Sequence, residues 1–165
     1  MNESPINDEF IQNVIDRYSD TIFRVSFQYV GNTLDAEDIV QDVFFALLEY
    51  ACLAEFESDE HMKAWLIRVA INKSKNAAKR NARRKSKELA GFMAPSEVTE
   101  DRFDDLEFVL SGISPLDREI VYLHYYEGYS AKEIAEIVHK TEKSVFKRLS
   151  RARSKLKDFL SEGGR

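Results

Sequence analysis

Cationic side chains recur at helical spacing near the carboxyl end of the chain, where they could hold a phosphate backbone. Ser130 and Glu133 have the spacing of a capping box, which opens a short helix, and Thr141 can cap a second helix after a brief turn. Ala135 supplies the small side chain that two closely crossing helices need. This layout predicts a helix-turn-helix, whose second helix enters the major groove of DNA. The side chains expected to face the DNA are Lys143, Ser144, Phe146, Lys147, Arg148 and Arg151.

A second basic stretch lies in the middle of the chain. Residues 61–90 carry a net charge of +9, and long cationic stems of this kind can follow a phosphate backbone. Asn72 lies among them and could read a base edge. Trp65 could stack on a base, but its spacing with neighbouring apolar residues favours a place in the core.

An acidic strip precedes this basic stretch. Asp38, Gln41, Asp42 and Phe45 are about one helical turn apart, so a helix places them on one face. Carboxylates beside an amide suit a partner helix rich in arginine. For this strip alone, a solvated surface is the simpler interpretation.

In the tail, the capping box, the small crossing residue and the basic excess coincide, which favours DNA binding over a plain helical hairpin.

The formal net charge of −5 conceals blocks of alternating sign. Residues 1–60 sum to −12, residues 91–127 to −7 and residues 128–165 to +5, around the basic stretch described above. A purely solvated surface mixes the two signs more evenly. The blocks therefore predict two basic surfaces for a polyanion and one acidic surface for a basic partner.

Helices are the only elements that the apolar pattern predicts, because apolar residues recur every three or four positions without the alternation of strands. The first helix is expected over about 6–30, with Gly31 as its stop. Asp35 is expected to cap the second helix, and the third is expected to start near His61. The apolar residues expected on the inner faces of the first two helices are Phe10, Val14, Tyr18, Ile22, Val25, Tyr29, Ile39, Val40, Val43, Phe44, Leu47 and Leu48.

The composition changes at residues 91–100, which predicts part of a linker, and a short acidic helix is expected over 101–110. Ser114 and Pro115 then predict a helix start, with the proline at the first helical position. The buried side of that helix is expected to carry Ile120, Leu123 and Tyr126.

Several classes of protein are disfavoured by the residues present. With the single cysteine Cys52, the chain can form no internal disulfide and no multi-cysteine zinc site. His61, His124 and His139 lack the spacing of metal ligands, and no glycine loop for phosphates is present, so we expect no cofactor and no enzyme. The first residues lack the pattern of a signal peptide, and no stretch is apolar enough to span a bilayer. We therefore expect a cytoplasmic protein without membrane insertion.

Four segments, in order along the chain, carry a family resemblance. They are DAEDIVQDVF at 35–44, KAWLIRVAINK at 63–73, GYSAKEIAEI at 128–137 and RLSRARSKL at 148–156. Together they resemble a bacterial sigma factor of the sigma-70 family, and the layout is similar to the extracytoplasmic-function (ECF) group, which keeps only regions 2 and 4. The resemblance implies an all-α chain of two small helical domains. It places a region 2 bundle over 1–90, a linker over 91–105 and a region 4 helix-turn-helix over 106–165.

The resemblance also implies partners and residue roles. Such proteins bind core RNA polymerase at its β′ clamp helices and β flap, direct it to promoter DNA, and are often held by an anti-sigma factor. The loop at 56–63 and Asn72 would capture an unstacked base of the −10 element, and the tail helix would read the −35 element. The residues implied to contact −10 DNA are His61, Lys63, Arg68, Asn72, Lys73, Lys79, Arg80, Arg83 and Arg84. The residues implied to bind polymerase are Asp38, Gln41, Asp42 and Phe45.

The chain departs from the family pattern at three positions in the tail: His139, Phe146, and Lys140, where the family usually has an apolar residue. The family usually has glycine in place of His139, and a left-handed residue other than glycine costs about 1 kcal/mol, so the turn is expected to differ slightly. Phe146 stands where many members carry a cation, and it could touch a thymine methyl group or a partner surface. The alternative function is a helix-turn-helix regulator that never binds polymerase, which would leave residues 35–84 unexplained.

Overall fold

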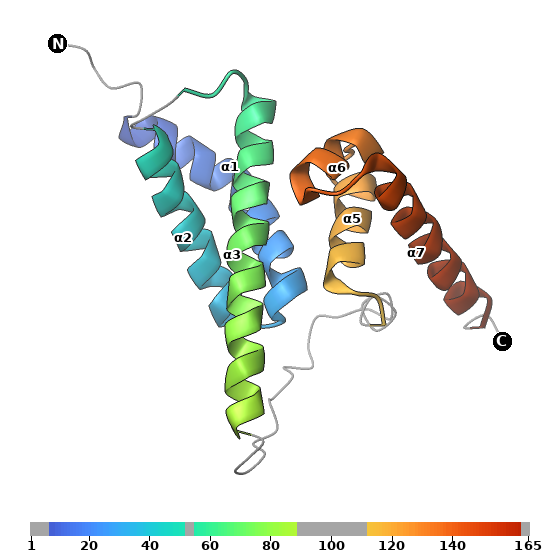
Figure 1. Cartoon of the computed structure of the whole chain (residues 1–165). Helices are drawn as coiled ribbons and strands as arrows, with labels where there is room; N and C mark the ends of the chain where they lie inside the picture. The colour runs from blue at the N-terminus through green and yellow to red at the C-terminus, as the bar shows by residue number, and fades with distance from the viewer. Residues whose placement is uncertain (1–6, 52–54, 89–111, 163–165) are drawn as a thin grey trace. The chain divides into compact units, whose positions relative to one another are not determined.

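Helices are the only regular elements in the residues that the computed structural model describes, which are 7–51, 55–88 and 112–162 (Figure 1). The helices are α1 (Asp8–Val30), α2 (Thr33–Ala51), α3 (Asp59–Glu88), α5 (Pro115–Tyr125), α6 (Ala131–Val138) and α7 (Glu142–Glu162). They form two compact units, residues 1–87 and 88–165. The predicted all-α architecture of two small helical domains is confirmed. The predicted linker at 91–105 and the predicted helix at 101–110 lie outside the described residues.

The first two helices form a hairpin whose turn is set by local hydrogen bonds. Gly31 ends α1 in the left-handed conformation (φ 69°), and its N–H donates to the carbonyl of Phe27 at 3.0 Å. Asn32 caps α2, because its Oδ1 accepts from the backbone N–H of Asp35 at 2.9 Å. The expectation that Asp35 is itself the cap is therefore wrong. The helix begins two residues earlier, at Thr33, and Asp35 lies in its first turn.

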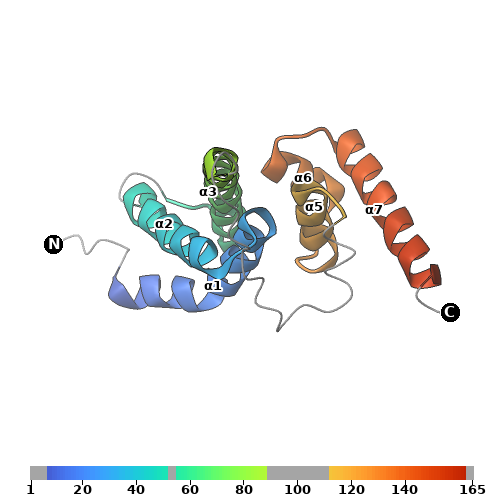
Figure 2. The ribbon, with the colours of Figure 1, turned by 90° about the horizontal axis from the view of Figure 1, so that it is seen from below.

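The third helix packs along the hairpin through one apolar stripe. Ser58 caps it, since the Ser58 hydroxyl accepts from the N–H of His61 at 3.1 Å. Its buried apolar side chains are Met62, Leu66, Ile67, Ala70, Ile71 and Ala77. Figure 2 views α3 nearly end-on, with α1 and α2 beside it. Residues 82–87 are all exposed, so the last turns of α3 extend beyond the packed stripe.

Three residues predicted to face the core do not. Phe10 and Leu48 are each 37% exposed, while Leu47 beside the latter is 1% exposed and fills the core instead. Tyr126 is 61% exposed at the C-cap of α5, where its ring stacks on that of Tyr122 with the centroids 5.0 Å apart instead of entering the core. The inner faces of the first three helices otherwise match the predicted pattern at most positions.

The second unit contains the predicted caps. The Ser114 hydroxyl accepts from the N–H of Asp117 at 3.2 Å, and Pro115 occupies the first helical position of α5. Ser130 and Glu133 form the complete capping box at the start of α6. The Thr141 hydroxyl accepts from the N–H of Ser144 at 3.1 Å and caps α7. The buried core of this unit includes Ile113, Ile120, Leu123, Ile134, Ile137, Val138, Val145 and Leu149.

None of the helices in the described ranges has both the length and the apolar character that crossing a bilayer requires.

Candidate nucleic-acid and polymerase interfaces

The turn between α6 and α7 is built at His139. This residue adopts the left-handed conformation (φ 54°), and its N–H donates to the carbonyl of Ala135. The N–H of Lys140 donates to the same carbonyl at 3.0 Å. Ala135 is only 7% exposed, which agrees with the small inward-facing side chain predicted at this position. Histidine therefore accepts a conformation that favours glycine, and the helix-turn-helix forms.

The outer face of α7 presents a cationic surface. The inner face of this helix is buried in the second unit, where it contacts α5 and α6. The exposed side chains among those predicted to meet DNA are Lys143, Phe146, Lys147 and Arg151, with Ser144 half buried. Phe146 is 55% exposed, which is unusual for a phenylalanine and leaves its ring open to a partner. We call these five residues the α7 face.

Arg148 differs from its predicted neighbours on α7. Its guanidinium Nη1 donates to Asp117 Oδ1 of α5 at 2.6 Å, and the two side chains are only 25% and 18% exposed. Its Nε is buried and has no hydrogen-bond partner among the described residues. In this structure Arg148 therefore links α7 to α5 instead of extending outward.

The acidic strip lies on one face of α2. Asp38, Gln41 and Asp42 are exposed, and Phe45 is 64% exposed among them. We call these four residues the α2 ridge. Leu34, 75% exposed, extends the ridge toward the start of the helix, and Leu48 extends it toward the end. The spacing of Leu34 and Leu48 with Phe45 would have predicted this extension from the sequence. An apolar strip flanked by carboxylates suits a partner helix that carries both apolar and basic side chains.

The carboxyl-terminal half of α3 carries a concentrated positive charge. Lys79, Arg80, Arg83 and Arg84 are all exposed there, and the neutral Asn72 is exposed near the middle of the helix. A hollow of about 280 Å³ is lined entirely by cations, namely Arg80, Arg83, Arg84 and Lys87. Four cationic side chains around one hollow can surround a phosphate group with charge-assisted hydrogen-bond donors. We call these four residues the α3 basic end.

The start of α3 adjoins a cluster of rings. His61 is exposed, its Nδ1 accepts from the N–H of Glu57 at 3.3 Å, and it meets the edge of Phe56 with ring centroids 5.6 Å apart. Phe56 also contacts Tyr50 and Trp65, with centroids 5.0 Å and 5.6 Å apart. Trp65 is half buried within this cluster, so its predicted place in the core is only partly realised.

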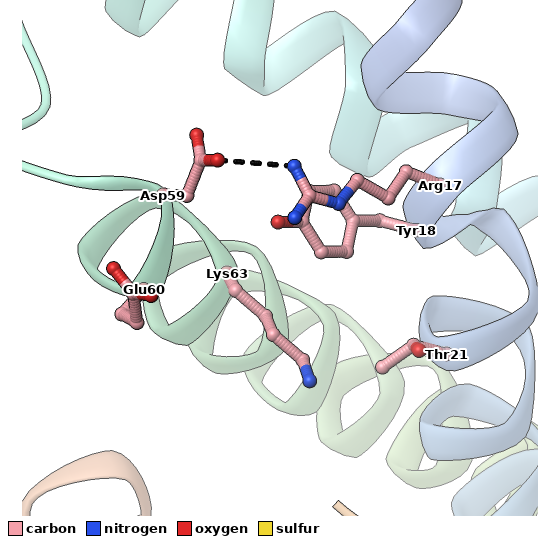
Figure 3. A pocket seen from close by; sticks show the side chains of 6 residues that line it. All are labelled: Arg17, Tyr18, Thr21, Asp59, Glu60 and Lys63. Carbon is pink, nitrogen blue, oxygen red and sulfur yellow. Dashed lines mark hydrogen bonds and ion pairs between the residues drawn. The ribbon is translucent and has the colours of Figure 1, made fainter.

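Beside this cluster, α1 and α3 enclose a hollow of about 320 Å³. Figure 3 shows Arg17, Tyr18 and Thr21 lining it from α1, opposite Asp59, Glu60 and Lys63 of α3. The Arg17 guanidinium donates to Asp59 at 3.0 Å, and this hydrogen bond raises the pKa of the arginine above its ordinary value. Sequence reasoning did not find Arg17, because no local spacing pairs it with a residue 42 positions away.

Three of the predicted −10 contacts are less exposed than the others. Lys63, Lys73 and Arg68 are half buried. The Nε of Arg68 is buried and has no hydrogen-bond partner within the described ranges. They are spread along the first half of α3, and Lys63 also lines the hollow at the start of this helix. The structure therefore brings the predicted −10 residues onto one helix but spreads them over its whole length.

Two family descriptions match this chain. Residues 14–84 match Sigma-70 region 2, and residues 103–156 match Sigma-70, region 4. The chain belongs to the sigma-70 family. The first match covers the α2 ridge and the α3 basic end apart from Lys87, and the second match covers the α7 face.

Named relatives place this sigma factor in the ECF group. It is 32% identical over 143 residues to the RNA polymerase sigma factor CnrH of Cupriavidus metallidurans, covering 76% of this chain and 73% of that one. It is 30% identical over 138 residues to NccH of Alcaligenes xylosoxydans xylosoxydans, with the same coverage. The ECF sigma factor SigW of Bacillus subtilis is 26% identical over 174 residues, covering 91% of this chain and 88% of SigW.

Two solved structures share the fold. One is the sigma factor RpoE in complex with the anti-sigma factor NepR from Bartonella quintana, with a TM-score of 0.75, 22% identity, and coverage of 94% of this chain and 98% of that one. The other is CnrH in complex with the cytosolic domain of CnrY, with a TM-score of 0.66, 23% identity, and coverage of 94% and 90%.

The family settles the general function. This sigma factor directs RNA polymerase in promoter recognition, so its partners are core RNA polymerase and promoter DNA. It is a transcription initiation factor and not an enzyme. The alternative of a regulator that never binds polymerase is set aside, because residues 14–84 match a sigma region that such a regulator would lack.

Proposed function

We propose that this sigma factor holds two promoter elements on two separate basic surfaces and docks on core polymerase through the α2 ridge. The observation that supports this proposal is the segregation of charge on exposed helix faces. The ridge is an exposed acidic and aromatic strip on α2, whereas exposed cations gather on α3 and on α7. A polyanion and a basic partner can therefore bind the same molecule without competing for one surface.

The α7 face reads the −35 element in this proposal. Lys147 and Arg151 are one turn apart and exposed, which suits contacts to successive phosphates. Lys143, Ser144 and Phe146 lie in the first turns of α7, the part of a recognition helix that reaches base edges. Arg148 acts by positioning, because its bond to Asp117 holds α7 against α5.

In this proposal, residues along the whole of α3 bind the −10 element. His61 and Asn72 are exposed at the start and middle of the helix, where an unstacked base could be held. Lys63, Arg68, Lys73 and Lys79 follow the helix toward the α3 basic end, which would grip the backbone of the neighbouring duplex. The energy of unstacking a base, a few kcal/mol, is offset by these phosphate contacts and by the contacts of the captured base.

On the polymerase side, the α2 ridge contacts the β′ clamp helices and the second unit contacts the β flap. Both contacts require the cytoplasm, where core polymerase acts. The sigma factor RpoE, which shares the fold, was solved in complex with the anti-sigma factor NepR, and this supports an inhibitor of the same kind for this chain. Such an inhibitor would have to cover the ridge or one of the basic surfaces to silence the protein.

Run-off transcription with purified core polymerase tests the proposal. The unmodified protein is expected to give a promoter-dependent transcript, and changing Asp38, Gln41 and Asp42 together to alanine is expected to abolish it and to remove the protein from pulled-down polymerase. Full transcription by this triple variant would show that the ridge is not the docking surface. Loss of the transcript while the variant stays bound to polymerase would contradict it equally.

A further inference from the structure

A three-residue network ties the turn between α1 and α2 to the far end of α3. The Oδ2 atom of Asp35 accepts from the side-chain amide of Asn81 at 2.7 Å, across 46 positions of sequence. The same oxygen accepts from the side-chain amide of Asn32 at 2.8 Å, and the backbone N–H of Asp35 donates to Asn32 at 2.9 Å. Asp35 and Asn81 are both half buried, so water competes only partly for these bonds.

The network sits at the last point where α3 is held. Ala77 is buried in the packed stripe, and Asn81 is half buried one turn later. Every side chain over 82–87 is exposed. A helix end without packing frays readily, because few contacts oppose its opening. The α3 basic end straddles this boundary, with Arg80 just before Asn81 and Arg83, Arg84 and Lys87 after it.

The groups around Asp35 stabilise its negatively charged form. Hydrogen bonds from Asn32 and Asn81 lower the pKa of Asp35 below its ordinary value, and Arg84 and Arg80 lower it further. The carboxylate is therefore ionised at neutral pH, and it attracts two of the arginines of the α3 basic end. Asp35 lies in the first turn of α2, one turn before Asp38, which begins the α2 ridge.

We propose that Asp35 is a positioning residue, which fixes the α3 basic end relative to the polymerase-docking helix through its bond to Asn81. It does not touch DNA in this proposal. Its contribution is to keep the last turns of α3 formed, so that Arg80, Arg83 and Arg84 meet phosphates in register with the docked polymerase. The inference rests on the proposed DNA role of these arginines.

Hydrogen exchange on the full chain tests whether the hydrogen bond between Asp35 and Asn81 stabilises the end of α3. In Asp35→Ala, amides over 78–88 are expected to exchange about tenfold faster, the change expected when a hydrogen bond to a charged group is lost. Asn81→Ala removes the same bond from the other side without changing the charge, and it is expected to give the same acceleration. Glu37→Ala is the matched control, because Glu37 is an exposed acid in the same turns of α2. Exchange over 78–88 that is equal in Asp35→Ala and in the control would overturn the proposal.

Holoenzyme binding to promoter DNA tests the consequence. For Asp35→Ala, the slope of log affinity for DNA against log salt concentration is expected to become less steep, by the amount that corresponds to the loss of about one to two phosphate contacts. The affinity for core polymerase is expected to stay unchanged. The exchanged pair Asp35→Asn with Asn81→Asp restores the bond with donor and acceptor reversed, and it is expected to restore the slope. A purely destabilising effect of Asp35→Ala would leave the slope unchanged in the folded fraction, and that result would contradict a positioning role.

A triple change of Arg80, Arg83 and Arg84 to alanine separates the two proposals. If it flattens the slope while Asp35→Ala does not, the arginines bind DNA and Asp35 does not position them. If the triple variant leaves the slope unchanged, the DNA role of the arginines is wrong and the positioning role of Asp35 fails with it. The expected result is a flatter slope in both variants, with the larger effect in the triple variant.

Discussion

Arg148 of α7 donates to the carboxylate of Asp117 of α5 at 2.6 Å, across 31 positions of sequence. The bond sets the recognition helix on its support, because Asp117 itself lies in the first turn of α5 beside the Ser114 cap. A residue whose type suggests DNA contact thus helps to hold the helix that makes such contacts.

Breaking this ion pair is expected to destabilise the second unit. Asp117→Ala leaves the half-buried Arg148 guanidinium without its partner, so the free energy of unfolding should fall by about 1–3 kcal/mol, between the values for exposed and buried pairs. Urea unfolding with hydrogen exchange in α5 and α7 measures the change. Lys147→Ala is the control, since Lys147 is an exposed cation on the same helix, next to Arg148 in the sequence. Equal stability of the two variants would show that the pair contributes nothing measurable.

Phosphate contacts made by the α7 face are expected to make the affinity for DNA depend on the salt concentration. Lys147→Ala and Arg151→Ala should each weaken binding to all DNA sequences alike and reduce the salt slope by about 1, because each removes one charge that displaces a counterion. Fluorescence anisotropy over a range of salt concentrations checks this. A changed base preference at the −35 element, with an unaltered slope, would assign these side chains to base reading instead.

Substitution of two exposed phenylalanines is expected to affect polymerase binding and DNA binding separately. Phe45 on α2 is 64% exposed and Phe146 on α7 is 55% exposed, so neither ring contributes much to the core. Phe45→Ala is expected to weaken core-polymerase binding about tenfold or more, since buried aromatic anchors dominate interfaces. Phe146→Ala is expected to leave that affinity unchanged and to reduce −35 binding. Each variant is the control for the other, and the reverse pattern would exchange the two assignments.

The capping box of α6 should make the second unit sensitive to acid. The backbone N–H and the hydroxyl of Ser130 lower the pKa of Glu133 below its ordinary value of 4.5. The stabilisation is therefore complete above that ordinary value and is lost as the pH falls through the lower pKa of the folded state. The stability difference between the unmodified protein and Glu133→Gln is expected to be constant from pH 7 to about 5.5 and to shrink below pH 4.5. A difference that does not change with pH would show that the carboxylate charge is unimportant.

Relief of the strained turn at His139 is expected to stabilise the second unit. The residue is left-handed (φ 54°), a conformation that costs about 1 kcal/mol outside glycine. His139→Gly should therefore raise the free energy of unfolding by about 0.5–1 kcal/mol in the same hydrogen-exchange assay of α6 and α7. Gly128→Ala is the opposite control, because Gly128 also has a positive φ (78°) and alanine there should destabilise. A loss of stability in His139→Gly would mean that the imidazole makes a favourable contact.

Local features of this protein could be predicted from its residues alone. The left-handed stop at Gly31, the proline start at Pro115 and the Ser130–Glu133 box are confirmed, because each depends on groups within four positions of one another. The exposed α2 ridge was identified by spacing alone, since residues a turn apart share a helix face whatever the rest of the fold. The cap of α2 was misplaced for a local reason as well, because Asn32 and Asp35 are both good capping residues and only one can occupy the position.

Tertiary structure alone decided which charged residues meet partners far away in the sequence. Arg17 with Asp59, Asp35 with Asn81, and Arg148 with Asp117 are pairs separated by 42, 46 and 31 positions. Their meeting depends on how the helices cross, which follows from the packing of buried side chains and not from the spacing of the polar ones. The sequence therefore determined the helices, their faces and the family, whereas the packing determined which cations remain exposed to DNA and which hold the helices in place.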